Sequence, residues 1–224
     1  MFLSFWSVKG GSGTTVVAVA KALELARSEP DGVLLVDLAG DAAAVLGCPE
    51  PDGPGISEWL SRGPSVPPDG LARLERPVAT GLTTIGWGHT PVGPAEVERA
   101  QVLAALLAAD VRPVLVDCGL VHDDGSPPDD IRAIFACAAT HSWLVTRSCY
   151  LSLRRATRAA HRPSGVVLVR EPGRALDATD IEHILEVPVV CEVEWDPAIA
   201  RAVDGGLLAR RLPRALGHAV RRVA

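Results

Sequence analysis

The sequence predicts a doubly wound, mostly parallel α/β sheet, and three observations support this fold class. Short runs rich in β-branched residues alternate with alanine-rich segments of helical length. Several of the apolar runs are continuous, as expected for parallel strands that are buried on both faces. A glycine-rich loop joins the first apolar run to the first helical segment. With 224 residues, of which 48% are hydrophobic, the chain is expected to form a single domain over 1–224.

The predicted strands are the apolar runs, and the predicted helices are the segments between them. The strands are expected at 2–7, 33–37, 82–87, 112–117, 142–147, 165–170 and 188–192. The helices are expected at 15–28, 94–109, 128–139, 151–161, 177–185, 197–204 and 213–223. In a sheet of this kind, ligands bind beyond the carboxyl ends of the strands, so the glycine-rich loop lies at the ligand edge.

The segment 48–93 differs from the rest because it is rich in proline and glycine. We interpret it as an ordered but irregular excursion from the α/β pattern, with short helices near "ISEWL" and "LARLE". A flexible linker would lack apolar anchors, whereas this segment contains Trp59, Leu60, Ile85 and Trp87.

Composition argues against several classes of protein. A net charge of -5 argues against a chain that is attracted as a whole to nucleic acid. The five cysteines form no C-x-x-C pair, so the spacing of a zinc site is absent. Their odd number, and a start that reads as a strand rather than a secretion signal, favour a reducing cytoplasmic location. No run reaches the roughly 18 apolar residues that span a bilayer, and the histidines show no metal-ligand spacing.

The stretch "SVKGGSGTTVV" (7–17) indicates a phosphate-binding loop. Glycines let the backbone turn so that successive N–H groups point at an anion, and the following helix adds its positive end. In such loops a lysine follows the last glycine and reaches the outer phosphates, and the next Ser or Thr holds magnesium. Here Thr14 occupies the lysine position, whereas Thr15 keeps the metal-ligand position. The predicted nucleotide-binding residues are Lys9, Gly10, Gly11, Ser12, Gly13, Thr14 and Thr15. A tight turn that only serves the fold is the alternative.

Two aspartates end predicted strands at the same edge. Asp37 closes the run "VLLVD" and Asp117 closes "RPVLVD". Together with Thr15 they are the candidate magnesium ligands if a nucleotide binds. The alternative is a polar residue that caps the turn after each strand.

These motifs resemble those of the ParA/MinD family. "KGGSGTT" is similar to the family's deviant Walker A loop, K-G-G-x-G-K-[ST], at six of seven positions. "GVLLVDLAGD" resembles its second strand and first switch, and "PVLVDCG" its Walker B strand. The segment from "VLVREPGR" to "AVDGG" resembles the CpaE/TadZ branch, which is linked to Tad pilus assembly and polar positioning. The resemblance covers nearly the whole chain, is weakest over 48–93, and implies a SIMIBI-type P-loop NTPase with a three-layer sandwich.

The resemblance also implies roles for particular residues. Family members form sandwich homodimers around two ATP molecules, and the early lysine that crosses to the partner's phosphates matches Lys9. An aspartate two residues after the second strand positions the attacking water, but Ala39 occupies that position and Asp41 is too far along to replace it. An asparagine often contacts adenine after the strand 165–170, where this chain has Arg170 and Glu171.

The two substitutions at Thr14 and Ala39 set the functional expectation. Loss of one charged hydrogen bond costs about 1.5–3 kcal/mol, which is about ten- to a hundredfold in affinity. Binding of ATP and Mg²⁺ is therefore expected to be weak or lost, and catalysis suffers more because the lysine also stabilises the transferring phosphoryl group. We expect no enzyme but a dimerising scaffold that positions an unknown partner, such as Tad pilus machinery, at a pole or septum. The alternatives are an active ATP-driven switch and a DNA-binding partitioning accessory.

Two basic segments suggest further partners. The helix 151–161 carries several arginines, which form either a solvated face or a surface for non-specific DNA contact. The tail 210–224 places Leu212, Leu216, Ala219 and Val223 on one side of a helix and basic residues largely on the other. Either this helix docks on the body, or it binds a membrane surface or a partner. The second possibility would place the protein at the inner membrane face or a cell pole.

Overall fold

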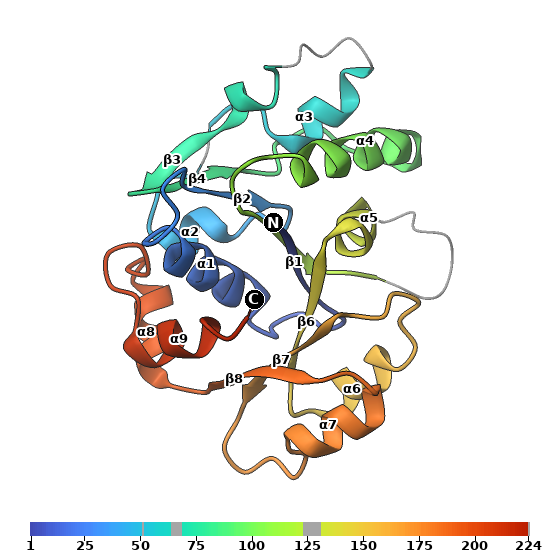
Figure 1. The fold of residues 1–224 in the computed structure, drawn as a ribbon, viewed down its shortest axis with the longest axis vertical. Coiled ribbons are helices and arrows are strands. Elements are labelled where there is room, and N and C mark those ends of the chain that lie inside the picture. Colours follow the sequence, from blue (N-terminus) through green and yellow to red (C-terminus); the bar gives the residue numbers. More distant parts are fainter. Residues whose placement is uncertain (51, 64–68, 123–130, 224) are drawn as a thin grey trace.

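A computed structural model describes residues 1–50, 52–63, 69–122 and 131–223. Within these residues, Figure 1 shows one central sheet with helices on both faces. The strand order is β3-β4-β2-β5-β1-β6-β7-β8, and every pair is parallel except β3–β4. The predicted fold class is confirmed. The strands are β1 (Phe2–Ser7), β2 (Val33–Asp37), β3 (Arg76–Ala79), β4 (Leu82–Ile85), β5 (Val114–Leu120), β6 (His141–Arg147), β7 (Gly165–Arg170) and β8 (Val189–Glu194).

Helices cover the two faces of the sheet in separate groups (Figure 1). Successive residues of a strand point to opposite faces. Phe2 and Trp6 of β1 therefore enter one core, beneath α3 to α7, while Leu3 and Phe5 enter the other, beneath α1, α2, α8 and α9. The helices are α1 (Thr14–Leu25), α2 (Ala42–Leu46), α3 (Ile56–Ser61), α4 (Val97–Ala108), α5 (Ile131–Ala138), α6 (Tyr150–Ala156), α7 (Ala178–Leu185), α8 (Pro197–Asp204) and α9 (Arg214–Val220).

Several element boundaries differ from the predicted ones. The helix predicted at 151–161 ends at Ala156, where the Thr157 hydroxyl donates to the Arg154 carbonyl, a local bond that competes with helix continuation. β5 continues to Leu120 because a register shift between Phe5 and Trp6 lets β1 pair with it beyond Asp117. The sequence patterns missed α2 and β3, which are too short to show a period. Residues 128–130 of the helix predicted at 128–139 lie outside the described residues.

The excursion over 48–93 contains α3, β3, β4 and the 3₁₀ helix η2 (Ala72–Leu74). Glu58 on α3 ties this helix to the loop after β4, because its carboxylate accepts backbone N–H groups of Gly55, His89 and Thr90 at 2.6–2.8 Å. Burial alone would raise the pKa of Glu58, but these hydrogen bonds outweigh it and lower the pKa to about 2. Trp59 and Leu60 on the same helix are buried in the core.

The tail forms a docked helix. Leu216 and Val220 of α9, and Val223 after it, are buried in the core on the α1 side of the sheet. The Arg221 guanidinium lies 3.3 Å from the Glu24 carboxylate of α1. The structure therefore agrees with the docking interpretation, whereas binding of this segment to a membrane or a partner stays a prediction. Among the described helices, none has the length and apolar character that a bilayer span requires.

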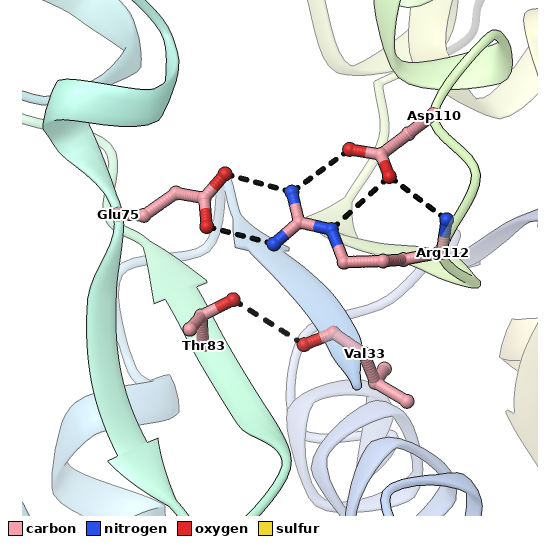
Figure 2. Close-up of polar contacts among 5 residues, drawn as sticks. All are labelled: Val33, Glu75, Thr83, Asp110 and Arg112. Atoms are coloured by element: carbon pink, nitrogen blue, oxygen red, sulfur yellow. Dashed lines mark hydrogen bonds and ion pairs between the residues drawn. The ribbon is translucent and has the colours of Figure 1, made fainter. Parts of the chain in front are cut away.

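An ion triad fastens the antiparallel edge of the sheet to its centre (Figure 2). The Arg112 guanidinium, just before β5, donates to both Glu75 oxygens at 2.7 and 2.8 Å and to the Asp110 carboxylate at 2.8 and 3.1 Å. These hydrogen bonds lower the pKa of Asp110. On the adjacent strands, the Thr83 hydroxyl donates to the Val33 carbonyl.

We expect Arg112→Ala to lower the free energy of unfolding by about 2–3 kcal/mol, because it leaves two half-buried carboxylates facing each other. Arg73→Ala is the matched control, since the Arg73–Asp69 pair is exposed and such pairs contribute less than about 1 kcal/mol. Urea denaturation measures both variants. Equal losses in the two variants would show that the triad has no special stabilising role.

Candidate nucleotide site

The predicted site residues converge at one edge of the sheet. β1 lies between β5 and β6, and parallel pairing brings the carboxyl ends of β1, β2 and β5 together. Asp37 lies opposite Asp117 in register, and Phe5 of β1 lies on the other side of Asp117. The loop that follows β1 therefore begins next to both aspartates.

The loop has the backbone shape of a phosphate cradle. Gly11 and Gly13 have φ values of 75° and 93°, in the region that favours glycine. A Cβ added at Gly10 or Gly11 would meet nothing within 4 Å, so the space above the loop is open. The Ser12 hydroxyl donates to the Lys9 carbonyl at 2.7 Å and braces the turn. Residues 14–16 open α1, and in the described chain their backbone N–H groups donate to no protein group. An anion fits this arrangement.

The residue at the expected lysine position carries no charge, although the Arg132 Nε–H donates to the carbonyl of Leu38, next to Asp37, at 3.1 Å. Thr14 is buried at the start of α1 and offers only a hydroxyl. Lys9 lies at the side of the loop next to α6. The pKa of the Cys149 thiol is lowered, first by the backbone N–H of Ser152 and further by the charge of Lys9, which places this ammonium group near the start of α6. Neither Asp37 nor Asp117 forms an ion pair with any described residue.

Asp117 has the properties expected of a ligand that lacks its partner. Its side chain is fully buried, its Oδ1 accepts the Gly119 N–H at 3.0 Å, and its Oδ2 has no hydrogen-bond partner among the described residues. Burial, followed by the charge of Asp37, raises the pKa of Asp117 to about 7, while the Thr15 hydroxyl acts in the opposite direction. The orphaned oxygen and this hydroxyl fit a magnesium ion that also takes oxygens from a bound phosphate.

The Asp37 carboxylate accepts hydrogen bonds from the backbone of the residues that follow it. Its Oδ1 accepts the N–H groups of Ala39 and Gly40 at 3.0 and 2.7 Å, and its Oδ2 accepts that of Ala42 at 2.8 Å. Burial nevertheless raises its pKa. The carboxylate thus shapes the turn that starts α2. No group of three or more His, Cys, Asp or Glu side chains suited to a metal occurs in the described chain, so a metal here would depend on phosphate oxygens.

The residues at and after Ala39 offer little for activating water. The Ala39 methyl group is half-buried, and a Cβ added at Gly119 would lie 2.9 Å from it. Asp41 is exposed at the N-cap of α2, and its charge raises the pKa values of Asp37 and Asp117, so it lies within electrostatic reach of both. It makes no capping hydrogen bond with its side chain.

A cavity of about 220 Å³ continues from the loop toward the carboxyl terminus. Ser12 and Gly13 form one end, and the walls are largely apolar. This volume accommodates a planar ring, although it is smaller than the pockets of about 300–1,000 Å³ that hold drug-sized ligands. Its apolar lining includes Val16, Val17, Val193, Ile199, Ala200 and Val203.

Sequence reasoning identified Arg170 and Glu171 near this cavity but missed Arg147 and Trp195, which line it. Arg147 at the end of β6 lies 5.3 Å from the ring centre of Trp195 and donates to Glu171 at 2.7 Å. Glu171 also accepts from Arg174 at 2.8 Å, so the position after β7 holds an ion cluster rather than an amide. Arg170 pairs with Glu192 and Glu194 on β8. The signal that would have located Arg147 and Trp195 is their position at the ligand edge, because the former is the last residue of β6 and the latter directly follows β8.

The fold is that of the ParA/MinD P-loop ATPases. The chain is similar to the ParA family ATPase of Chlorobium tepidum, with a TM-score of 0.72 and 20% identity over 97% of this chain and 94% of that one. MinD of Pyrococcus horikoshii, complexed with Mg-ADP, matches with a TM-score of 0.74 and 17% identity over 99% and 93%. The ATP complex of a Cyanothece McdA variant matches with 0.71 and 16% over 99% and 94%. No protein-family model and no curated protein matches the chain.

The raised pKa of Asp117 predicts a pH dependence of stability. An ordinary aspartate titrates near 3.8, so between pH 3.8 and about 7 the folded chain holds more protons than the unfolded chain. Stability contributed by this group therefore falls as the pH rises through that window. We expect Asp117→Asn to be more stable than wild type at pH 8, with the difference shrinking towards pH 4, in thermal unfolding without ligand. Asp31→Asn is the exposed control, because Asp31 lies in the turn before β2, at the other end of that strand from Asp37. A variant less stable than wild type at every pH would contradict this account.

Proposed function

We propose that this chain is a ParA/MinD-type protein of the CpaE/TadZ branch that has lost most or all ATPase activity and works as a dimerising scaffold. It positions another complex, such as Tad-type pilus machinery, inside the cell or at its inner membrane face. The observation that carries the proposal is a phosphate cradle with intact backbone shape in which Thr14 stands at the lysine position. The likeness in fold to positioning ATPases supports it.

The site retains the parts that need no side-chain charge. The N–H groups of the first turn of α1, and the open space above Gly10 and Gly11, suit phosphates. The apolar cavity that follows suits the base. Thr15 and Asp117 would hold magnesium, which neutralises phosphate charge when bound. ATP therefore binds weakly in one chain.

Hydrolysis lacks two of its requirements. The phosphoryl group that departs develops charge that a lysine would stabilise, and the buried hydroxyl of Thr14 carries no charge. No carboxylate extends from position 39 to orient water, because Ala39 ends in a methyl group packed near Gly119. Restoring one of these parts alone leaves the other missing.

We therefore predict ATP turnover indistinguishable from a buffer blank. Thr14→Lys should tighten ATP binding by about tenfold or more, because it restores a charged hydrogen bond, yet leave turnover low. Calorimetry measures binding and phosphate release measures turnover. Robust magnesium-dependent phosphate release by the unmodified protein would identify an active switch instead.

The missing charge can come from a second copy. β1 and β6 pair with Trp6 opposite Leu144, so Lys9 leaves the sheet beside the start of α6. Tyr150 and Leu151 in the first turn of α6 are 69% and 51% exposed, and the Arg155 guanidinium donates to the Val8 carbonyl. A contact that delivers Lys9 to the cradle of a second copy would cover these two apolar side chains. This face suits an isologous dimer.

We expect ATP to raise the dimer fraction of wild type, and Lys9→Ala to weaken dimerisation and ATP binding together. Leu151→Asp should raise the dimer dissociation constant by about tenfold or more, because it buries a charge in an apolar contact. Val111→Asp is the matched control, since Val111 is 88% exposed and follows α4. Analytical ultracentrifugation decides. If neither ATP nor Lys9→Ala changes the dimer fraction, the coupling is wrong and the loop serves only the fold.

A further inference from the structure

Helix α8 is seated loosely over the cavity. It begins with Asp196 as N-cap and Pro197 in the first turn, both strong helix-start features. None of its residues is fully buried, although Ile199 and Val203 face the core on the α1 side of the sheet. These two side chains and Ala200 also line the cavity of about 220 Å³, so part of the surface of α8 faces a void. Such a void removes packing contacts on one side of the helix.

The glycines after the carboxyl end of α8 pack directly against the residues at the end of α2. Gly47 follows α2 with φ 76°, and Gly206 follows α8 with φ 58°. A Cβ added to Gly206 would lie 2.9 Å from the Gly47 Cα and 3.5 Å from the Ala44 carbonyl oxygen. The two backbones therefore touch with no side chain between them.

Helix α2 in turn is attached to the candidate site. Asp37 accepts the N–H of Ala42, the first residue of α2, at 2.8 Å, and also holds Ala39 and Gly40. Asp37 lies in register with Asp117. A continuous path of contacts thus runs from the cavity wall through α8, the Gly206–Gly47 contact and α2 to the turn that Asp37 organises.

We propose that filling the cavity beneath α8 stiffens the Asp37 turn through the Gly206–Gly47 contact. This regulation rests on the proposed function in one respect, because the natural occupant would be the planar base of a nucleotide whose phosphates lie at the loop. Occupancy gives α8 the packing contacts it lacks and holds its carboxyl end against α2. Occupancy of the cavity beneath α8 then changes the stiffness of the Asp37 turn, although no residue belongs to both.

A variant that fills the cavity tests the coupling without any ligand. Ala200→Leu places added methyl groups into the cavity from α8 itself. We expect slower amide hydrogen exchange in α8. We also expect exchange at the α2 amides to slow by about two- to thirtyfold. The readout amides have hydrogen bonds within this segment, namely Val45 to Asp41, Gly47 to Ala44 and Cys48 to Ala43. Slowing confined to α8, or no slowing anywhere, would overturn the proposal.

A second substitution tests the route. Gly206→Ala in the Ala200→Leu background should keep the slowing in α8 but lose it at α2, because the new methyl group separates the two glycines. Gly205→Ala controls for a methyl group added at the end of α8, since a Cβ there faces Arg201 and Leu207 rather than α2. Gly173→Ala controls for a methyl group added at a positive φ, because Gly173 has φ 78° and nothing within 4 Å of an added Cβ. Retention of the α2 effect in the Gly206→Ala background would show that the contact is not the route. Thermal unfolding confirms that each variant is folded.

The closing measurement separates this proposal from the proposed function. ATP and inorganic pyrophosphate are titrated against wild type and Ala200→Leu. We expect wild type and Ala200→Leu to bind pyrophosphate with equal affinity. Weaker binding of ATP by Ala200→Leu would then show that the base occupies the cavity. If wild type binds neither ligand, the proposed nucleotide binding is wrong. The hydrogen-exchange data still test the coupling between α8 and α2, because they need no ligand. If ATP binds both equally, the base lies elsewhere and the occupant part of the proposal is wrong.

Discussion

Two buried carboxylates on neighbouring strands, with no ion-pair partner among the described residues, constrain the whole candidate site. Asp37 meets this constraint by turning both oxygens to backbone N–H groups, which fixes the turn into α2. Asp117 retains an oxygen without a partner and holds its proton more tightly than an exposed aspartate would. With Thr14 rather than a lysine in the loop, protonation of Asp117 relieves part of this constraint, and a bound cation would stabilise its charged form.

The sequence was sufficient for the fold class and for the positions of the loop, Asp37 and Asp117, because each follows a continuous apolar run. It was not sufficient where tertiary contacts decide. α2 is a five-residue helix that exists because Asp37 caps its first N–H and Gly47 ends it, and neither effect has a period. β3 contains Pro77, which argues against a strand interior, yet it pairs at the sheet edge where a missing N–H is tolerated. The cavity beside Trp195 depends on how far α8 stands from the sheet, which no spacing in the sequence encodes.

Similarity of fold does not settle chemistry here. The chain superposes over nearly its full length on ATPases at 16–20% identity, but function resides in the side chains placed on a fold. The motif that the sequence resembles would place an ammonium group at position 14 and a carboxylate at position 39, whereas this chain has the hydroxyl of Thr14 and the methyl group of Ala39 there. Arg147 and Glu171 form an ion pair beside Trp195, where the resemblance implies an amide. The glycine turns at Gly11 and Gly13 and the start of α1 are backbone features that suit an anion.

The two outer strands of the sheet are unsuited to accepting another strand. On one side, Pro77 removes a donor from β3, and Arg76 presents an exposed charge. On the other side, Glu192 and Glu194 project from β8 and pair with Arg170. Exposed edges with proline and charge resist the strand-by-strand growth that leads to fibres. Any assembly of copies of this chain is therefore expected to form through its loops and helices rather than by the joining of two sheets.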